Sequence, residues 1–521
     1  MAKSVSVAEL KSVLEGALDV ACIDVRETAE YNAAHIGGTV SLPRRQIEFR
    51  MHELVPYAGT RVILCDDDSR RATLAAGTLE SMGYTDVAVL TGGMNRWVTD
   101  GETTEWGVNV PSKDFGEKLL LTKDVPEVDP DELHAWLESG RKLVLLDSRT
   151  PEEHQRACIP GSRSMPGAEL GLRAWELMDD PDTTVVVHCA GRTRSIVGAG
   201  TLQRMGVKNV FALKNGTMGW ELAGLKVETG STRLEMPAPT EAKKQEAEAT
   251  ARRVAFEEGV SFIAPEQIDD FVSRAVKENV YLLDVRTREE HAEGHIPGFR
   301  WVPGGQAVQA WDSFVAVKGG QLVFACDGVT RAAMTASWFR QMGFPNVYVV
   351  DGGTIAWTNS GRALESGMAP SKPAIESTPD VVASAWDLSR RLKADGAPVV
   401  IHVGTSDEFS GGHVPGSSWV PRSWLELRID DVAQPTDSVV VTCADGVNSA
   451  LAASTLRKMG YTDVSVLTGG LKAWRDANQP VERGLTGVTS SPDDVLPVRR
   501  SYAEMMNYLR WEEELGKKYR K

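Results

Sequence analysis

The chain contains four copies of one sequence unit, and this repeat constrains the fold more than any other feature. The first half of the unit reads "CIDVRETAEYNAAHIGGT" (22–39), "LLDSRTPEEHQRACIPGS" (145–162), "LLDVRTREEHAEGHIPGF" (282–299) and "VIHVGTSDEFSGGHVPGS" (400–417). The second half reads "GYTDVAVLTGGMNRW" (83–97), "GVKNVFALKNGTMGW" (206–220), "GFPNVYVVDGGTIAW" (343–357) and "GYTDVSVLTGGLKAW" (460–474). Because the motifs keep their order, we expect four tandem domains of one fold.

The repeat boundaries place these domains at residues 1–110, 125–235, 257–370 and 371–484. Residues 236–256 are charged and rich in alanine, which predicts a helical linker that divides the chain into two pairs of domains. Residues 485–521 predict a helical tail with an apolar face formed by Met505, Tyr508, Leu509 and Trp511. This face packs on a domain of the chain or, as the alternative, binds a partner protein.

Each copy alternates apolar strands with helices, which predicts an α/β domain with a mainly parallel sheet and helices on both faces. One strand ends in Asp-x-Arg, and the next, "TTVVV" in the second copy, runs into "HCAGRTRS" (188–195). Ligands of such sheets bind beyond the carboxyl ends of the strands. The loop that begins at Cys189 lies at such an end, so it is the candidate active site.

The spacing within the repeats identifies the residue that replaces the cysteine in the first domain. Cys189 lies 42 positions after Asp147 and 31 before Trp220, and Cys326 has the same two spacings in the third copy. In the first copy the same count leads to Asp66, one residue after Cys65. We therefore expect the first domain to lack the catalytic thiol.

The composition of the "CAGRTRS" loop favours a reactive thiolate at Cys189. A free cysteine has a pKa of about 8.5 and attacks only as thiolate. The positive end of the following helix, the N–H groups of a glycine-containing loop, and Arg192 and Arg194 all stabilise an anion. The loop is therefore expected to hold a thiolate and a small anionic substrate.

Asp-x-Arg, His-Ile-Pro-Gly and Cys-x4-Arg before a helix, repeated over nearly the whole chain, resemble the rhodanese family of sulfurtransferases. The resemblance implies four rhodanese-like domains and a cysteine that passes through a persulfide, with no metal or organic cofactor. It implies transfer of sulfane sulfur from thiosulfate to a thiol or cyanide. Two-step covalent transfer of this kind predicts ping-pong kinetics.

The resemblance also implies roles for individual residues. It makes Cys189 and Cys326 the catalytic candidates. Arg149 and Arg286 have two open roles, contact with substrate or support of the loops. The residues expected to bind substrate are Gly191, Arg192, Thr193, Arg194, Arg331, Arg149 and Arg286, and those expected to support the loops are Asp147, Asp284 and Ser195.

The third and fourth copies depart from the second. In "CDGVTRA" (326–332), Asp327 opposes thiolate formation at Cys326 and repels an anionic donor, so we expect a weaker site or a different donor. In the fourth copy Cys443 keeps its position, but Asn448 replaces the loop arginine. His402 and Gly404 replace the Asp-x-Arg pair there. We expect Cys443 to be inactive.

Composition and charge limit the partners. A hydrophobic content of 42% and a net charge of −15 indicate a globular protein without the basic surface that nucleic acids or anionic lipids require. The N-terminus has no apolar core typical of a signal peptide, which favours a cytoplasmic location. Six sparse cysteines without a CxxC pair predict free thiols. We expect small-molecule donors and acceptors, while the oligomeric state is open.

Four alternative hypotheses remain. In the first, the chain is a sulfur relay that delivers persulfide sulfur to a protein or a glutathione-type thiol. In the second, the sulfur donor is 3-mercaptopyruvate. In the third, the first and fourth domains are non-catalytic scaffold or regulatory modules. A phosphatase or arsenate reductase is disfavoured, because such relatives have Cys-x5-Arg, which only Cys65 and Arg71 match, with Asp66, Asp67 and Asp68 between them.

Overall fold

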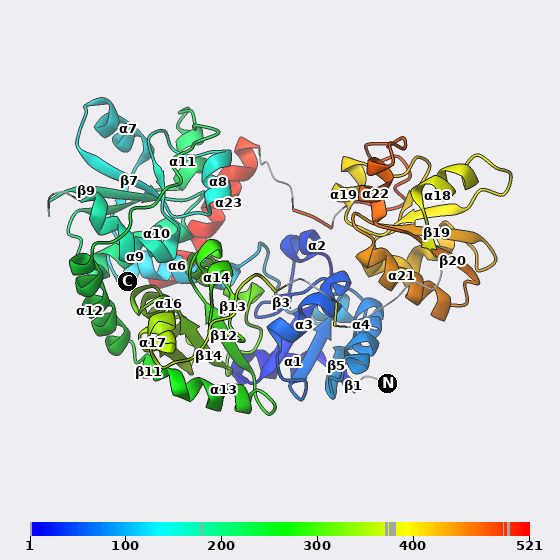
Figure 1. Cartoon of the computed structure of the whole chain (residues 1–521), viewed down its shortest axis with the longest axis horizontal. Coiled ribbons are helices and arrows are strands. Elements are labelled where there is room, and N and C mark those ends of the chain that lie inside the picture. Colours follow the sequence, from blue (N-terminus) through cyan, green and yellow to red (C-terminus); the bar gives the residue numbers. More distant parts are fainter. Residues whose placement is uncertain are drawn as a thin grey trace. The chain divides into compact units, whose positions relative to one another are not determined.

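The computed structural model describes residues 3–178, 180, 182–369, 373–374, 382–492, 494–496 and 501–520. It contains four five-stranded sheets, and the strand pairs within them are parallel (Figure 1). Each sheet has the same order, in which its first strand pairs with its fifth, followed by the fourth, second and third. The predicted architecture, four tandem α/β domains with parallel sheets, is therefore confirmed.

The strands follow the apolar segments of the repeats. The first sheet contains β1 (Lys3–Val5), β2 (Val20–Asp24), β3 (Val40–Ser41), β4 (Arg61–Cys65) and β5 (Asp86–Leu90). The second contains β6 (Glu127–Val128), β7 (Leu143–Asp147), β8 (Arg163–Ser164), β9 (Thr184–His188) and β10 (Val210–Leu213). The third contains β11 (Ser261–Ile263), β12 (Val280–Asp284), β13 (Arg300–Trp301), β14 (Gln321–Ala325) and β15 (Val347–Val350). The fourth contains β16 (Val382–Ala383), β17 (Val399–His402), β18 (Ser418–Trp419), β19 (Ser438–Thr442) and β20 (Asp463–Leu467).

The helices lie between these strands. The first domain has α1 (Val7–Gly16), α2 (Thr28–Ala33), α3 (Ile47–Leu54), α4 (Arg70–Ser81) and α5 (Gly93–Thr99). The second has α6 (Val110–Thr122), α7 (Pro130–Glu138), α8 (Pro151–Arg156), α9 (Gly167–Arg173), α10 (Thr193–Met205) and α11 (Gly216–Leu222). The third has α12 (Glu241–Glu257), α13 (Ile268–Arg274), α14 (Arg288–Glu293), α15 (Gly304–Gln309), α16 (Thr330–Gln341) and α17 (Gly353–Asn359). The fourth domain and the tail have α18 (Ala385–Arg391), α19 (Ser406–Gly411), α20 (Leu425–Arg428), α21 (Val447–Lys458), α22 (Gly470–Asp476) and α23 (Tyr502–Leu515).

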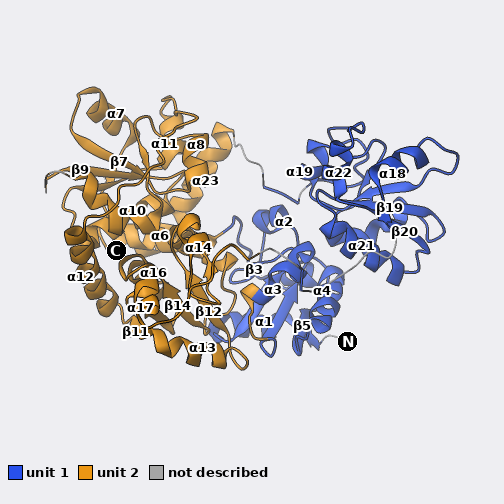
Figure 2. Ribbon diagram, viewed as in Figure 1, with its two compact units in different colours: residues 1–52, 58–108, 371–497 blue, residues 53–57, 109–370, 498–521 orange. Residues whose placement is uncertain are grey.

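The four domains pair in an order that the sequence did not indicate. One compact unit contains residues 1–52, 58–108 and 371–497, and the other contains residues 53–57, 109–370 and 498–521 (Figure 2). The first domain thus pairs with the fourth, and the second pairs with the third and the C-terminal helix. The expectation that the linker separates the first two domains from the last two is wrong.

The linker helix α12 explains this difference. Its alanine-rich face buries Ala247, Ala251 and Val254 in a core shared by the second and third domains, where Phe324 of β14 also lies. Because small side chains let the helix approach its neighbours closely, α12 is part of the core of its unit and not a spacer. The expected boundary between the third and fourth domains, at residues 370 and 371, lies outside the described residues.

The tail helix α23 packs on α6 in the second unit and buries Leu509, as the apolar pattern of the tail predicts. Among the described residues, no helix is long and apolar enough to cross a membrane.

Candidate active site

Cys189 is the first residue after β9, and the loop that follows it leads into α10. The residue is only 2% exposed. Its thiol donates to the Ser195 hydroxyl, with Sγ and Oγ 3.5 Å apart, and that hydroxyl donates to the Arg192 carbonyl at 2.8 Å. Ser195 therefore couples the thiol to the backbone of its own loop.

The second motif of the repeat holds this loop in place. The N–H groups of Thr217 and Met218, at the start of α11, donate to the carbonyls of Cys189 and Ala190 at 2.8 and 3.0 Å. Gly216 has a φ of 53°, and a Cβ built on it would lie 2.3 Å from the Cys189 carbonyl oxygen. Only glycine fits at this position, which explains the Gly in the repeated turn before each tryptophan.

The same contact occurs in the other three domains and identifies their equivalent residues. The N–H groups of Met94, Thr354 and Leu471 donate to the carbonyls of Asp66, Cys326 and Cys443 at 2.7, 2.9 and 2.9 Å, respectively. Asp66 thus occupies the position that the cysteines occupy elsewhere.

Two backbone N–H groups, three and six residues along the loop, point at this position. In the first domain, the N–H groups of Ser69 and Ala72 donate to the two carboxyl oxygens of Asp66 at 2.6 and 3.0 Å. In the fourth domain, the N–H groups of Gly446 and Ser449 donate to Cys443 Sγ at 3.2 and 3.4 Å. In these two domains the loop is therefore a cradle for an acceptor atom or a small anion at the cysteine position.

The two loop arginines of the second domain are already paired with carboxylates. Arg194 makes two parallel contacts with Glu153, at 2.6 and 2.8 Å. Arg192 binds Glu117 of α6 through Nε and Nη2, at 2.5 and 3.0 Å. Although burial opposes it, Glu153 raises the pKa of Arg194, so the guanidinium stays charged. Both were expected to bind substrate, but in this structure each neutralises an acid of its own compact unit.

The Arg194–Glu153 pair is a repeated structural element. Arg71 binds Glu30 in the first domain, and Arg331 binds Glu290 in the third. Each pair ties the loop to the helix that follows the Asp-x-Arg strand. In the fourth domain Asn448 replaces the arginine, and burial raises the pKa of Glu408, the equivalent acid.

Asp147 and Arg149 support the neighbouring loop. Arg149 Nε and Nη2 bind the Asp147 carboxylate at 2.9 and 2.7 Å, and Nη2 also donates to the Ala157 carbonyl. Asp284 and Arg286 repeat this arrangement. Of the two open roles, support of the loops accounts for the contacts of both arginines.

Sequence reasoning missed His154, whose Nδ1 lies 3.0 Å from Asp147 Oδ2. Burial opposes the charged form, but Asp147 and Cys158 raise the pKa of His154 to about 9. The signal was present, because Glu-Glu-His recurs in the third copy, where His291 Nδ1 lies 2.9 Å from Asp284.

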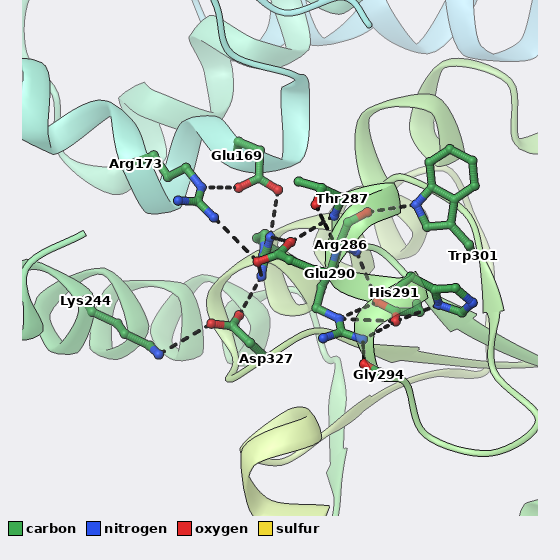
Figure 3. Close-up of polar contacts among 12 residues, drawn as sticks. Glu169, Arg173, Lys244, Arg286, Thr287, Glu290, His291, Gly294, Trp301 and Asp327 are labelled. Carbon is green, nitrogen blue, oxygen red and sulfur yellow. Dashed lines mark hydrogen bonds and ion pairs between the residues drawn. The ribbon is translucent and has the colours of Figure 1, made fainter. Parts of the chain in front are cut away.

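Cys326 lies in a closed, acidic environment. The residue is 0% exposed, and burial together with Asp327 raises its pKa to about 12. Arg331 contacts three carboxylates, those of Glu169 from α9, Glu290 and Asp327, at 2.8, 2.6 and 2.8 Å. These three acids are labelled in Figure 3. Both terminal nitrogens of the loop arginine are thus occupied by carboxylates.

All six cysteines are buried free thiols, as predicted. Burial raises the pKa of Cys443, although its sulfur has the two N–H contacts described above. The sequence-based expectation for Cys443 was based on the missing arginines and did not include this backbone contact.

Comparison with known proteins agrees with this architecture. The rhodanese-like domain family matches residues 6–100, 129–223, 268–360 and 384–477. The crystal structure of a thiosulfate sulfurtransferase from Pseudomonas aeruginosa has a TM-score of 0.91 and 34% sequence identity, and the alignment covers 99% of this chain and 98% of that one.

Shorter curated relatives match single parts of the chain. An uncharacterized protein, YqhL, from Bacillus subtilis (strain 168) is 41% identical over 76 residues, which are 14% of this chain and 59% of YqhL. A sulfurtransferase from Allochromatium vinosum is 30% identical over 103 residues, which are 20% of this chain and 94% of that protein. With four family matches and one full-length structural relative, the chain belongs to the family of proteins built from rhodanese-like domains.

Proposed function

We propose that the chain is a sulfurtransferase that carries sulfane sulfur as a persulfide on Cys189, with thiosulfate as donor and a thiol or cyanide as acceptor. The observation that carries this proposal is the cradle of N–H groups at the cysteine position, which holds a carboxyl group at Asp66 and a sulfur at Cys443. A thiolate or persulfide has the charge and size that such a cradle accepts.

The proposed reaction has two balanced steps. The Cys189 thiolate attacks the outer sulfur of thiosulfate, a bond forms between Sγ and that sulfur, and sulfite leaves with the electrons of the broken S–S bond. An acceptor thiolate or cyanide then attacks the outer sulfur, and the Cys189 thiolate is the leaving group. The products are a new persulfide or thiocyanate. These two reaction steps require no metal or organic cofactor.

We assign turnover to Cys189 and not to Cys326. At Cys326 an acidic neighbour and full burial disfavour the thiolate. At Cys189 the residue that follows is the uncharged Ala190, so the thiol lacks the adjacent carboxylate that opposes ionisation at Cys326. The donor assignment is supported by the full-length similarity to the thiosulfate sulfurtransferase from Pseudomonas aeruginosa.

Steady-state kinetics test the proposal. We expect parallel lines in double-reciprocal plots with thiosulfate and cyanide, because the two half-reactions share a covalent intermediate. Cys189→Ser should abolish turnover, while Cys326→Ser, the matched change in the third domain, should leave it unchanged. Intersecting lines, or full activity in Cys189→Ser, would show that the proposed route is wrong.

A further inference from the structure

The C-terminal helix α23 covers the loop that carries Cys189. A Cβ built on Gly191 would lie 3.1 Å from Glu512 Oε2 and 3.7 Å from Tyr508 Cε1, so both side chains of α23 lie against the middle of the loop. In the third domain the equivalent glycine, Gly328, faces α12 instead. The C-terminal helix α23 therefore covers the loop of Cys189. The loop of Cys326 is covered by α12, which is part of the core of the unit.

The helix also takes part in holding Arg192. Glu513 of α23 lies 3.5 Å from Arg192 Nη1, and Glu127 of β6 lies 3.4 Å from the same atom. Glu117 of α6 binds the other side of the guanidinium. Arg192 is 4% exposed, so in this arrangement it is enclosed by acids and is not presented to an incoming anion.

Glu512 makes this closed arrangement costly. It is 2% exposed, and its Oε1 accepts from the Tyr508 hydroxyl at 2.9 Å. Its Oε2 has no hydrogen-bond partner within the described part of the chain. A buried oxygen without a hydrogen-bond partner destabilises the folded state, because it has lost its contacts with water, and burial raises the pKa of this carboxyl. Burial outweighs the attraction of Lys113 and Arg192 and the hydrogen bond from Tyr508, so this position disfavours the charged carboxylate.

Contacts at the far end of α23 offset this cost. Lys518 and Tyr519, in the short helical turn Gly516–Tyr519, both bind Asp114 of α6, at 2.8 and 2.7 Å. Gly516 packs directly on α6, because a Cβ built on it would lie 3.2 Å from Glu117 Cβ. The end of the helix is thus anchored, while its middle places Glu512 Oε2, which has no hydrogen-bond partner within the described part of the chain, against the loop.

We propose that α23 is an autoinhibitory cover: while it is closed it shields Cys189 and holds Arg192 among carboxylates, and when it lifts it admits the sulfur donor and frees Arg192 for an anion. The cover deepens the proposed function, because it controls access to the same cysteine. Its presence is nevertheless measurable without any sulfur transfer.

Two variants loosen the cover without changing a residue of the loop, and the first of them also leaves Glu117, the partner of Arg192, without a new neighbour. Lys518→Ala with Tyr519→Phe removes both contacts to Asp114. Gly516→Val places a branched side chain against α6, where a single added Cβ is already tight, and its φ of −73° introduces no backbone strain. The matched control is Lys517→Ala, which removes an exposed ion pair with Glu514 on the same segment.

The readout is the rate at which iodoacetamide alkylates Cys189, measured by peptide mass spectrometry on the full chain, alongside hydrogen exchange over residues 502–515. We expect the rates of alkylation and of hydrogen exchange to rise about threefold or more in both loosened variants. The double variant loses one ion pair and one hydrogen bond, and Gly516→Val loses the close packing on α6. Lys517→Ala should match the parent protein.

Faster hydrogen exchange of α23 without faster alkylation of Cys189, or unchanged alkylation in both variants, would contradict the proposal that α23 covers the active loop. Alkylation requires no donor, so it is independent of whether thiosulfate is the substrate. If Cys189 is alkylated faster in the loosened variants but forms no persulfide with thiosulfate, the role of α23 is supported and the proposed function is wrong.

Discussion

At the cysteine position of the first domain, Asp66 places its carboxyl oxygens on the N–H groups of Ser69 and Ala72. Cys443 receives the same two contacts in the fourth domain. In these two domains the loop backbone therefore makes the N–H contacts that the glycine-containing loop predicts. Arg192 and Arg194, which we also expected to stabilise an anion, pair with Glu117 and Glu153 in the second domain and hold its loop in shape.

The first prediction concerns Gly216, which supports this loop from the second motif. Gly216→Ala should abolish most turnover, because the new Cβ cannot lie 2.3 Å from the Cys189 carbonyl oxygen without moving the loop. The left-handed backbone alone costs about 1–2 kcal/mol. Gly224 also has a positive φ, of 79°, but has nothing within 4 Å, so Gly224→Ala is the control for backbone strain. Equal activity of the two variants, measured with thiosulfate and cyanide, would contradict this role of Gly216.

The second prediction concerns pH and His154. Its pKa in the folded protein is raised to about 9, by Asp147 and Cys158 acting against burial. A raised pKa stabilises the fold fully below the unfolded value near 6.5, and this contribution is lost as the pH rises through about 9. Denaturant unfolding between pH 6.5 and 9 should show this loss in the parent protein.

In His154→Gln the loss should be much smaller, whereas His134→Gln, at a partly exposed histidine of α7, should behave like the parent. The same slope in all three proteins would rule out His154 as its source.

At the scale of elements, the repeats allowed the strands, the loops and the cysteine positions to be predicted, because backbone contacts fix the spacing from Cys189 to the Gly216 turn. The contacts of the arginines were not predictable in this way. Glu153 lies close in sequence to Asp147, but its pairing with Arg194 depends on how two strands and two helices pack. Glu513 reaches Arg192 across 321 positions of sequence, which no local pattern encodes.

The third prediction concerns α12, which the sequence presented as a linker. Ala251 is fully buried and Ala249 of the same helix is exposed. Ala251→Leu should lower the unfolding free energy of the second unit by about 1–3 kcal/mol, because an overpacked core forces its neighbours apart. Ala249→Leu should be neutral. Thermal unfolding of the parent protein and the two variants tests this prediction. If Ala251→Leu is as stable as Ala249→Leu, α12 does not form part of the core.

At the scale of the molecule, the chain has two compact units, and the proposed chemistry belongs to one of them. Cys189, α6 and α23 all lie in the second unit, although they are far apart in sequence. In the first unit the first and fourth domains meet through Arg422, which binds Glu48 at 2.8 and 2.5 Å, and through Arg44 and Glu426. This unit holds Asp66 and Cys443 at its two cysteine positions, which agrees with a non-catalytic role.

The fourth prediction tests this division. Arg422→Ala should destabilise the first unit by about 3–5 kcal/mol, because it leaves the buried Glu48 unpaired, and leave the rate of Cys189 persulfide formation unchanged. Arg390→Ala, which removes an exposed ion pair with Asp387 in the same unit, is the control. Calorimetry and the persulfide rate report the two effects separately, and a parallel fall in both would mean that the units do not act independently.

The measurement that tests the central claim most directly is intact-protein mass spectrometry after incubation with thiosulfate. We predict that the parent protein and Cys326→Ser each gain one sulfur, about 32 mass units, that Cys189→Ser gains none, and that cyanide removes the added sulfur. A parent protein that gains no sulfur, or a Cys189→Ser variant that still gains it, would contradict a persulfide on Cys189.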